Sequence, residues 1–213
     1  MNIEKKGFLN RFCFVFKMSE KQKTEVKTKP EDKPKVEEKI PGQKIKSNFA
    51  RENVYSEDQE SKNLYEQSRF GELKDNKVSY SLVEALYLLE KKKMDVLDDN
   101  KPLNYDSFLK RAKKIQPNFW VRYCVFRDLR SRGYIVKTAL KFGADFRVYD
   151  RGIKPGEDHA KWIVFPVHES EVLTWYEFSA KNRVAHSTRK RLLLGIVDEE
   201  EDVTYYECRW IRP

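Results

Sequence analysis

A tyrosine and a histidine stand at the two ends of a turn-rich loop in the stretch FRVYDRGIKPGEDHAKWIVF, residues 146–165. Tyr149 ends one expected strand and His159 begins the next, and the glycines and proline between them suit tight turns. Because a hairpin returns the chain beside itself, a phenol and an imidazole would meet at the mouth of this loop. Such groups can exchange protons with a reacting group, each transfer typically contributing about 10²–10⁴-fold. Polar residues on an ordinary loop rim would look the same, so this pair alone does not establish catalysis.

A basic cluster without an acid follows in AKNRVAHSTRKR, residues 180–191. It spans the end of an expected helix and the start of an expected strand, a plausible cradle for phosphate groups. A solvated surface at a helix C-terminus, where cations are favoured, explains the same pattern. The cluster contains Lys181, Arg183, His186, Arg189, Lys190 and Arg191.

Together these residues resemble the catalytic triad of the archaeal tRNA-intron splicing endonucleases: Tyr149, His159 ten residues later, and Lys190 thirty-one residues beyond that. The surrounding blocks FGADFRVY, HAKWIV, NRVAHSTRKRLLLGIVD and VTYYECRW are similar to that family too. The resemblance covers the C-terminal half densely and extends more loosely to VSYSLVEALYLLE, which is like a stretch of the family's N-terminal domain. Residues 1–46 lie outside it.

The resemblance implies an endoribonuclease that cuts precursor tRNA at bulge–helix–bulge junctions without metal or cofactor, leaving a 2′,3′-cyclic phosphate and a 5′-hydroxyl. It gives Tyr149 the role of base for the ribose 2′-hydroxyl, His159 that of acid for the leaving 5′-oxygen, and Lys190 that of charge stabiliser. Phenols are poor bases at neutral pH unless nearby cations stabilise the phenolate. Whether Tyr149 is the general base therefore stays open.

The family also holds flipped-out bulge bases between cationic and aromatic side chains from opposing subunits. The resemblance places Arg183 at the helix-end arginine of this clamp and Trp210, with Arg209 beside it, at the aromatic partner; Arg189 joins them as a predicted RNA-binding residue. Stacking of arginine and aromatic rings on a base tolerates any sequence. A core tryptophan on the last strand is the alternative for Trp210.

The acidic loop DEEED, residues 198–202, is either a solvated turn or an interface. In the homotetrameric members of the family an acidic loop at this position inserts into a basic cleft of a neighbouring subunit. The resemblance therefore predicts self-association as a homotetramer, although assembly with a separate structural subunit would leave the same residues. The predicted interface residues are Asp198, Glu199, Glu200 and Glu201.

Two other functions compete with this interpretation. A metal-dependent nuclease would use the acidic residues around the hairpin, but such enzymes need an acid two positions before Lys161, where this chain has His159. A non-catalytic structural or RNA-binding subunit is the second, and the complete Tyr–His–Lys set argues against it. His168 and His186 match no catalytic position of the family. The acids near the hairpin are Asp145, Asp150, Glu157 and Asp158.

The pattern of elements predicts an α+β fold, with a small N-terminal α/β domain over residues 47–116 and a C-terminal mixed-sheet nuclease domain, flanked by helices, over residues 117–213. Ser81 and Glu84 have capping-box spacing at the start of a helix. Helices are expected over 80–94, 105–115, from Pro117 to Gly133 and over about 170–184. Strands are expected over 134–143, 144–150, 159–167, 189–197 and 203–212.

Charge and composition indicate which parts of the chain fold and which kinds of site and location are expected. The chain has 213 residues and a formal net charge of +9, of which +6 lies in residues 1–46, a Lys/Glu/Pro-rich tail expected to be disordered. Met18 is a candidate start of translation, since residues 1–17 only mimic a signal peptide. The three cysteines, Cys13, Cys124 and Cys208, have no metal-site spacing. We expect a cytoplasmic protein with no membrane partner, because no apolar run spans a bilayer.

Overall fold

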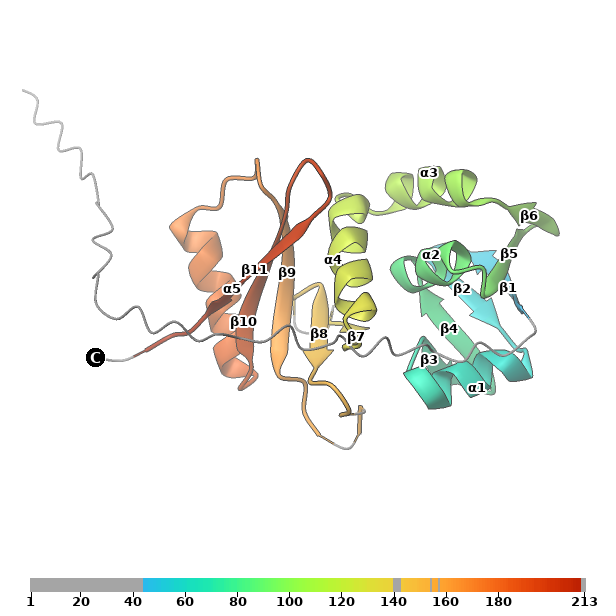
Figure 1. Ribbon diagram of the computed structural model, residues 1–213, viewed down its shortest axis with the longest axis horizontal. Helices are drawn as coiled ribbons and strands as arrows, with labels where there is room; N and C mark the ends of the chain where they lie inside the picture. The colour runs from blue at the N-terminus through green and yellow to red at the C-terminus, as the bar shows by residue number, and fades with distance from the viewer. Residues whose placement is uncertain (1–43, 140–142, 154, 157, 212–213) are drawn as a thin grey trace, which may run out of the picture. The chain divides into compact units, whose positions relative to one another are not determined.

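The computed structural model describes residues 44–139, 143–153, 155–156 and 158–211 (Figure 1). Ordered structure was expected from residue 47, but strand β1 already begins at Ile45, whose side chain is buried in the core. The expected disordered tail, apart from its last three residues, lies outside the described residues, as do Cys13 and the candidate start Met18. No helix in the described part of the chain is long and apolar enough to cross a membrane.

The first half of the described chain forms a six-stranded sheet in the order β3-β4-β2-β1-β5-β6. Only β1 and β5 pair in parallel, and the other neighbours are antiparallel. Its elements are β1 Ile45–Ala50, β2 Asn53–Ser56, α1 Gln59–Ser68, β3 Glu72–Lys74, β4 Lys77–Ser81, α2 Leu82–Glu90, β5 Met94–Asp98, β6 Lys101–Leu103 and α3 Tyr105–Ile115.

The second half forms a five-stranded sheet in the order β11-β10-β9-β8-β7. The pair β9 and β10 is parallel, joined by the crossover helix α5, and the other pairs are antiparallel. Its elements are α4 Phe119–Ser131, β7 Ile135–Thr138, β8 Phe146–Tyr149, β9 Trp162–His168, α5 Trp175–Ser187, β10 Arg191–Val197 and β11 Val203–Cys208. Two mixed sheets with helices confirm the predicted α+β fold.

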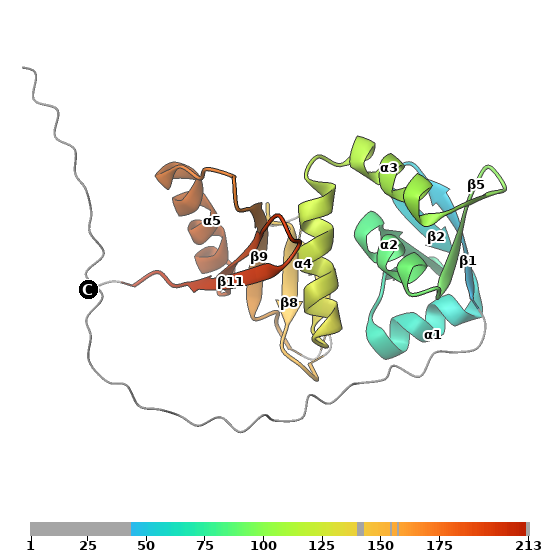
Figure 2. The ribbon, with the colours of Figure 1, turned by 45° about the horizontal axis from the view of Figure 1, so that its top comes forward.

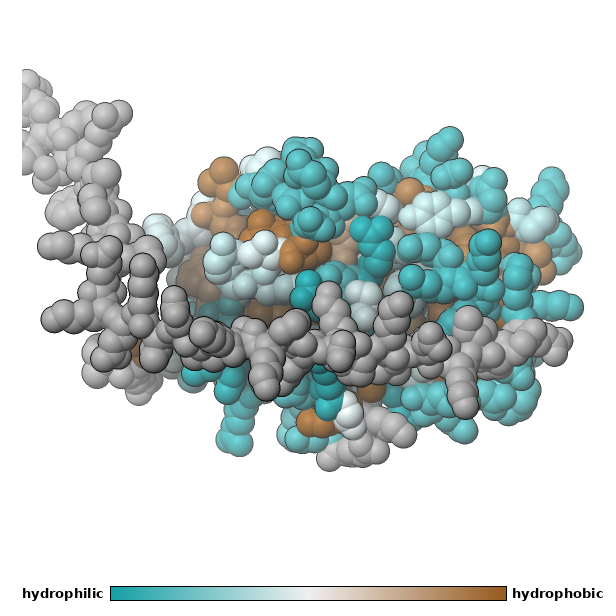
Figure 3. All heavy atoms as spheres, in the orientation of Figure 1, coloured by the Kyte–Doolittle hydropathy of each residue, from teal (hydrophilic) through white to brown (hydrophobic). Residues whose placement is uncertain are grey.

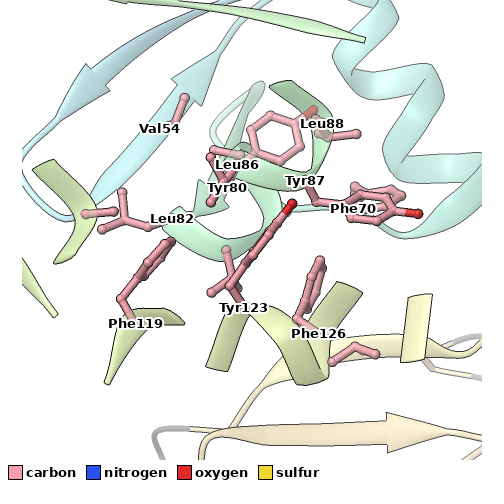
Figure 4. Close-up of a cluster of buried hydrophobic side chains, with 14 of the residues drawn as sticks. Val54, Phe70, Tyr80, Leu82, Leu86, Tyr87, Leu88, Phe119, Tyr123 and Phe126 are labelled. Carbon is pink, nitrogen blue, oxygen red and sulfur yellow. The ribbon is translucent and has the colours of Figure 1, made fainter. Parts of the chain in front are cut away.

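Helix α4 lies between the second sheet and helices α2 and α3 (Figures 1 and 2). Helix α4 is apolar on two sides, so one side packs against α2 and α3 and the other packs against the second sheet. Tyr123 and Phe126 face α2, where the rings of Tyr87 and Phe126 meet edge to face at 5.8 Å (Figure 4). On its other side Val125 lies against Gly195 of β10, where an added Cβ would come within 3.0 Å of Val125. One continuous core therefore joins the two sheets.

The second sheet is covered on both faces. Val148, Trp162 and Val164 belong to the core shared with α4, whereas Ile163 and Leu192 pack with Ala185 of α5. We call these the α4 face and the α5 face of the sheet. Because side chains alternate along a strand, each residue of β8 to β11 can be assigned to one face.

Several boundaries differ from the expected ones. Helix α4 begins at Phe119 rather than Pro117, because Asn118 adopts a left-handed conformation as its N-cap. Helix α5 begins at Trp175 rather than 170, where Thr174 and Glu177 form a capping box. The predicted capping box of Ser81 and Glu84 is confirmed at the start of α2. Strand β9 begins at Trp162, so His159 precedes the strand instead of starting it.

Candidate active site and RNA interface

The predicted triad lies at one edge of the second sheet. This edge is formed by the end of β8 and the starts of β9 and β10. Strand β8 is antiparallel to β9, and β9 is parallel to β10, so the end of β8 lies beside the starts of β9 and β10. The ladder extends past the strands: the Lys161 amide donates to Val148 O (2.9 Å), and the Arg191 amide donates to Lys161 O (3.0 Å). In Figure 1 the loop after β8 and the turn between α5 and β10 both lie at the lower edge of this sheet.

Tyr149 and His159 have different surroundings at this edge. Tyr149 is buried and pairs with Ile135 of β7. Val148 belongs to the α4 face, so Tyr149 belongs to the α5 face. His159 is exposed, and its amide donates to Asp158 Oδ1 at 2.6 Å. The loop therefore presents an accessible imidazole two residues before Lys161, whose amide bonds to Val148 beside the buried Tyr149.

An ion pair closes the base of the loop between these two residues. Lys161 Nζ donates to Asp150 Oδ2 at 2.5 Å, and both side chains are about one-third exposed. The Lys161 hydrogen bond lowers the pKa of the Asp150 carboxyl below its ordinary value. The pair ties the residue that follows Tyr149 to the residue that precedes β9.

A helix C-cap positions Lys190. The Arg189 amide donates to His186 O (3.0 Å) and the Lys190 amide to Ala185 O (2.8 Å), the two bonds of a Schellman motif. Arg189 occupies the left-handed position of this motif, with φ +55°, where glycine is the usual residue. Lys190 Nζ also donates to Thr188 O at 2.9 Å. The turn from α5 into β10 thus fixes the position of Lys190 at this edge of the sheet.

The predicted clamp residues lie around the end of α5. Arg183 is exposed one turn before His186, whose ring meets that of Trp210 edge to face at 4.4 Å. Trp210 is half exposed, so it is not the buried core tryptophan of the alternative interpretation. The ring of His186 thus contacts Trp210 at the end of α5, a contact the sequence did not predict.

Arg209 has a different partner from its neighbour Trp210. Its Nε donates to Glu207 Oε1 at 2.7 Å. Glu207 pairs in register with Leu193, so it lies on the α4 face, whereas the next residue, Cys208, packs on the α5 face with Leu192. Glu207 also accepts hydrogen bonds from Trp162 and Arg191. The Trp162 hydrogen bond, followed by those of Arg209 and Arg191, lowers the pKa of Glu207 to about 2.

The acidic loop divides into anchored and outward-facing carboxylates. Glu201 binds α4 of the same chain, accepting from Trp120 Nε1 (3.1 Å) and Arg127 Nη2 (3.3 Å). Asp198 closes the loop by accepting from the Asp202 amide at 2.8 Å. Glu199 and Glu200 are exposed. Of the four predicted interface residues, these two have the side chains most accessible to another molecule.

The acids of the metal-nuclease alternative do not gather in one place. Asp145 precedes β8 and forms an ion pair with Arg122 of α4 (2.8 Å), while Asp150 follows the same strand and pairs with Lys161. Asp158 binds the neighbouring amide, and Glu157 lies outside the described residues. In the parts of the chain that the structure describes, no group of three or more His, Cys, Asp or Glu side chains could hold a metal ion. Cys124 and Cys208 are free thiols.

Comparison with known proteins decides the family. Residues 45–109 match the model of the tRNA intron endonuclease N-terminal domain, and residues 119–205 match that of its catalytic C-terminal domain. The tRNA-splicing endonuclease of Pyrococcus abyssi is 43% identical over 162 residues, which cover 76% of this chain and 93% of that protein. The chain belongs to the tRNA intron endonuclease family. It is an endonuclease with the catalytic C-terminal domain.

Other tRNA-splicing endonucleases are similar to this chain over most of their length. The Nanoarchaeum equitans protein is 46% identical over 138 residues, covering 62% of this chain and 88% of that protein. The Methanothermobacter thermautotrophicus protein is 39% identical over 153 residues, covering 72% and 89%. Tyr149, His159 and Lys190 all lie inside the range matched by the family's catalytic domain, whereas Arg209 and Trp210 lie beyond it. Sequence reasoning missed Glu207, although its spacing of two from Arg209 was a signal that they share a strand face.

Proposed function

We propose that this endonuclease excises introns from precursor tRNA by metal-independent cleavage at bulge–helix–bulge junctions, giving 2′,3′-cyclic phosphate and 5′-hydroxyl ends. The observation that carries the proposal is the convergence of three strand ends at one sheet edge, bearing Tyr149, the His159 loop and Lys190. The tRNA-splicing endonucleases that the chain resembles support precursor tRNA as the substrate.

The chemistry needs two proton transfers and one stabilised charge. The ribose 2′-oxygen attacks the adjacent phosphorus as it loses its proton, and the phenolate of Tyr149 at the sheet edge accepts that proton and becomes a phenol. The bond from phosphorus to the 5′-oxygen breaks as His159, on the accessible side of the loop, protonates the leaving oxygen. Lys190 offsets the negative charge that develops on the phosphorane, a contribution of roughly 10²–10³-fold for a well-placed donor.

One cleavage assay tests this proposal. A bulge–helix–bulge RNA is incubated with the purified chain in excess EDTA, and the product ends are identified. His159→Ala should lose at least about 10²-fold in rate. His168→Ala is the matched control, because His168 ends β9 at the opposite edge, roughly 20 Å away by strand length. Absence of the cyclic phosphate, or full activity of His159→Ala, would overturn the mechanism. Cleavage by the chain alone would also dismiss the structural-subunit alternative.

We also propose that Arg183 and Trp210, contributed by opposing subunits, hold a flipped-out base between them, with Arg189 on a nearby phosphate. Trp210 contacts His186 at the end of α5, Arg183 lies one turn earlier on this helix, and Arg183 and Arg189 are exposed, which supports their contact with RNA. Trp210→Ala should weaken binding of the bulged RNA by the roughly 1–3 kcal/mol that one base stack contributes. A fully paired RNA of the same length, which offers no free base, should bind both proteins equally.

Finally, we propose self-association as a homotetramer acting as two functional pairs. Large apolar side chains on the second sheet and α5 support it: Trp175 and Tyr176 are 83% and 84% exposed, and Tyr206 on the edge strand β11 is 59% exposed. Figure 3 shows pale and brown side chains on the visible surface of this part of the molecule, where the pale colour marks residues of intermediate hydropathy such as tryptophan and tyrosine. A second copy of the chain is the proposed occupant of this surface, since a free strand edge pairs most simply with its own copy.

Light scattering tests the assembly in two steps. Trp175→Glu with Tyr176→Glu should halve the particle mass if the apolar surface joins copies. Glu199→Ala with Glu200→Ala should reduce the mass if the acidic loop docks into a neighbour. A monomeric wild-type protein, or variants of unchanged mass, would contradict the proposed interfaces.

A further inference from the structure

Glu207 is a carboxylate bound to two arginines near the edge of the sheet that carries the proposed active site. It accepts hydrogen bonds from Trp162 Nε1 (2.8 Å), from Arg191 Nη1 (3.2 and 3.3 Å to its two oxygens) and from Arg209 Nε (2.7 Å). A carboxylate does not bind RNA phosphates, so its presence beside the basic residues of this edge calls for a reason other than substrate binding. Its partners come from the start of β9, the start of β10 and the segment after β11.

Two partners of Glu207 stand directly beside a residue of the proposed site, and the third is connected to the hairpin loop. Arg191 directly follows Lys190, and Arg209 directly precedes Trp210. Trp162 connects the network to the hairpin loop, because Lys161 Nζ lies 4.3 Å from the Trp162 ring centroid and also pairs with Asp150, the residue after Tyr149. One carboxylate thus ties together the strand ends from which the proposed site residues extend.

The network lies on the opposite side of the sheet from the proposed site. Trp162 and Glu207 belong to the α4 face, whereas Tyr149 belongs to the α5 face and Trp210 contacts His186 of α5. Glu207 is therefore placed to act on the backbones of the strands rather than on a substrate.

We propose that Glu207 is a positioning residue that holds the starts of β9 and β10 and the segment after β11 in the arrangement needed for cleavage. This inference rests on the proposed function of the same edge. Loss of the carboxylate frees two arginines and loosens three strand ends together. A displacement of about 1 Å at reacting groups can cost about 10²-fold in rate, while removal of one negative charge does not weaken RNA binding.

The test compares Glu207→Ala with Glu207→Gln and Glu57→Ala on a bulge–helix–bulge RNA. Glu207→Ala should lower kcat by about 10–100-fold without raising KM, whereas Glu207→Gln, which keeps an acceptor oxygen, should recover most of kcat. Glu57→Ala removes the same charge from an exposed pair with Lys77 in the first sheet and should leave both constants unchanged. A raised KM with unchanged kcat would overturn the proposal.

Hydrogen exchange of the free proteins separates this inference from the proposed function. Glu207→Ala should speed exchange of the Lys161 and Arg191 amides, which bond the segment before β9 to the end of β8 and to the start of β10, and Glu57→Ala should not. Unchanged exchange at these amides would overturn the positioning role even if the wild type cleaves RNA. If the wild type cleaves no RNA, the proposed function fails, and the exchange result alone decides whether Glu207 positions these strands.

Discussion

Glu84 and Glu207 each hold distant segments together through one carboxylate, but they differ in exposure. Glu84 is 5% exposed, at the junction of the two sheets, and accepts from the Gly71 amide (2.9 Å) and the Ser81 amide (3.0 Å). Lys137 of β7 lies 3.9 Å from it and donates to Gly71 O. The Glu207 side chain is 25% exposed and faces solvent at the edge of the second sheet.

Because Glu84 is buried and Glu207 is exposed, we expect the first to affect the stability of the fold and the second to affect the function of the site. A buried ion pair that loses one partner leaves an uncompensated charge, which costs several kcal/mol. An exposed pair contributes about 0–1 kcal/mol, because water screens and replaces it. The Glu84 cluster should therefore control folding, and the Glu207 cluster should control geometry at the proposed active site with little effect on folding.

The largest effect is expected at the buried cluster. Lys137→Met leaves Glu84 buried without its cation and should lower the free energy of unfolding by about 3–5 kcal/mol. Lys77→Met, which removes the cation of the exposed Glu57 pair, should cost about 0–1 kcal/mol. Denaturant unfolding measures both. Equal losses would mean that burial does not separate the two kinds of pair.

A backbone change in the same buried cluster should rank second. Gly71 has φ +70°, and an added Cβ would lie 2.5 Å from Val78 Cγ1 and 2.9 Å from Ser79 O. Gly71→Ala should cost about 2–4 kcal/mol from strain and overpacking. Gly133→Ala has a similar φ of +85° but meets no atom within 4 Å, so it should cost only about 1 kcal/mol in denaturant unfolding. If both changes cost the same, the close approach at Gly71 contributes nothing.

The exposed cluster should respond to acid with a smaller change. The pKa of Glu207 is lowered from 4.5 to about 2, so the stabilisation by its charge is complete above about pH 4.5 and is lost as pH falls toward 2. The difference in thermal stability between wild type and Glu207→Gln should therefore narrow from pH 5 to pH 2. A constant difference over this range would show that the Glu207 charge does not stabilise the fold.

The smallest effect on folding is expected at Arg189. Arg189→Gly places glycine at φ +55°, where it is favoured, so the melting temperature should stay or rise slightly. Loss of one phosphate contact should reduce the salt slope of RNA binding by about one. Arg51→Gly makes the same change at φ +56° in the turn between β1 and β2 and should leave the slope unchanged. Equal slopes for the two variants would remove Arg189 from the RNA surface.

Local patterns predicted the α+β class and the elements of the second half. The helices expected over 105–115 and from Pro117, and the positions of the second-half strands along the chain, follow from spacing and turn residues that act within a few positions. The boundaries were less accurate where caps decided them, as with the capping box of Thr174 and Glu177, which could have been recognised from their spacing.

The sequence by itself determined the family, through the order and spacing of Tyr149, His159 and Lys190 within matching blocks. It also determined the capping box of Ser81 and Glu84, because partners three residues apart meet within one helical turn. Only the tertiary structure decided that Glu84 meets Lys137 and that Glu207 meets Trp162 and Arg191. These partners meet because of sheet register and the packing of α4 between the sheets, and no local period of the chain specifies which distant strands become neighbours.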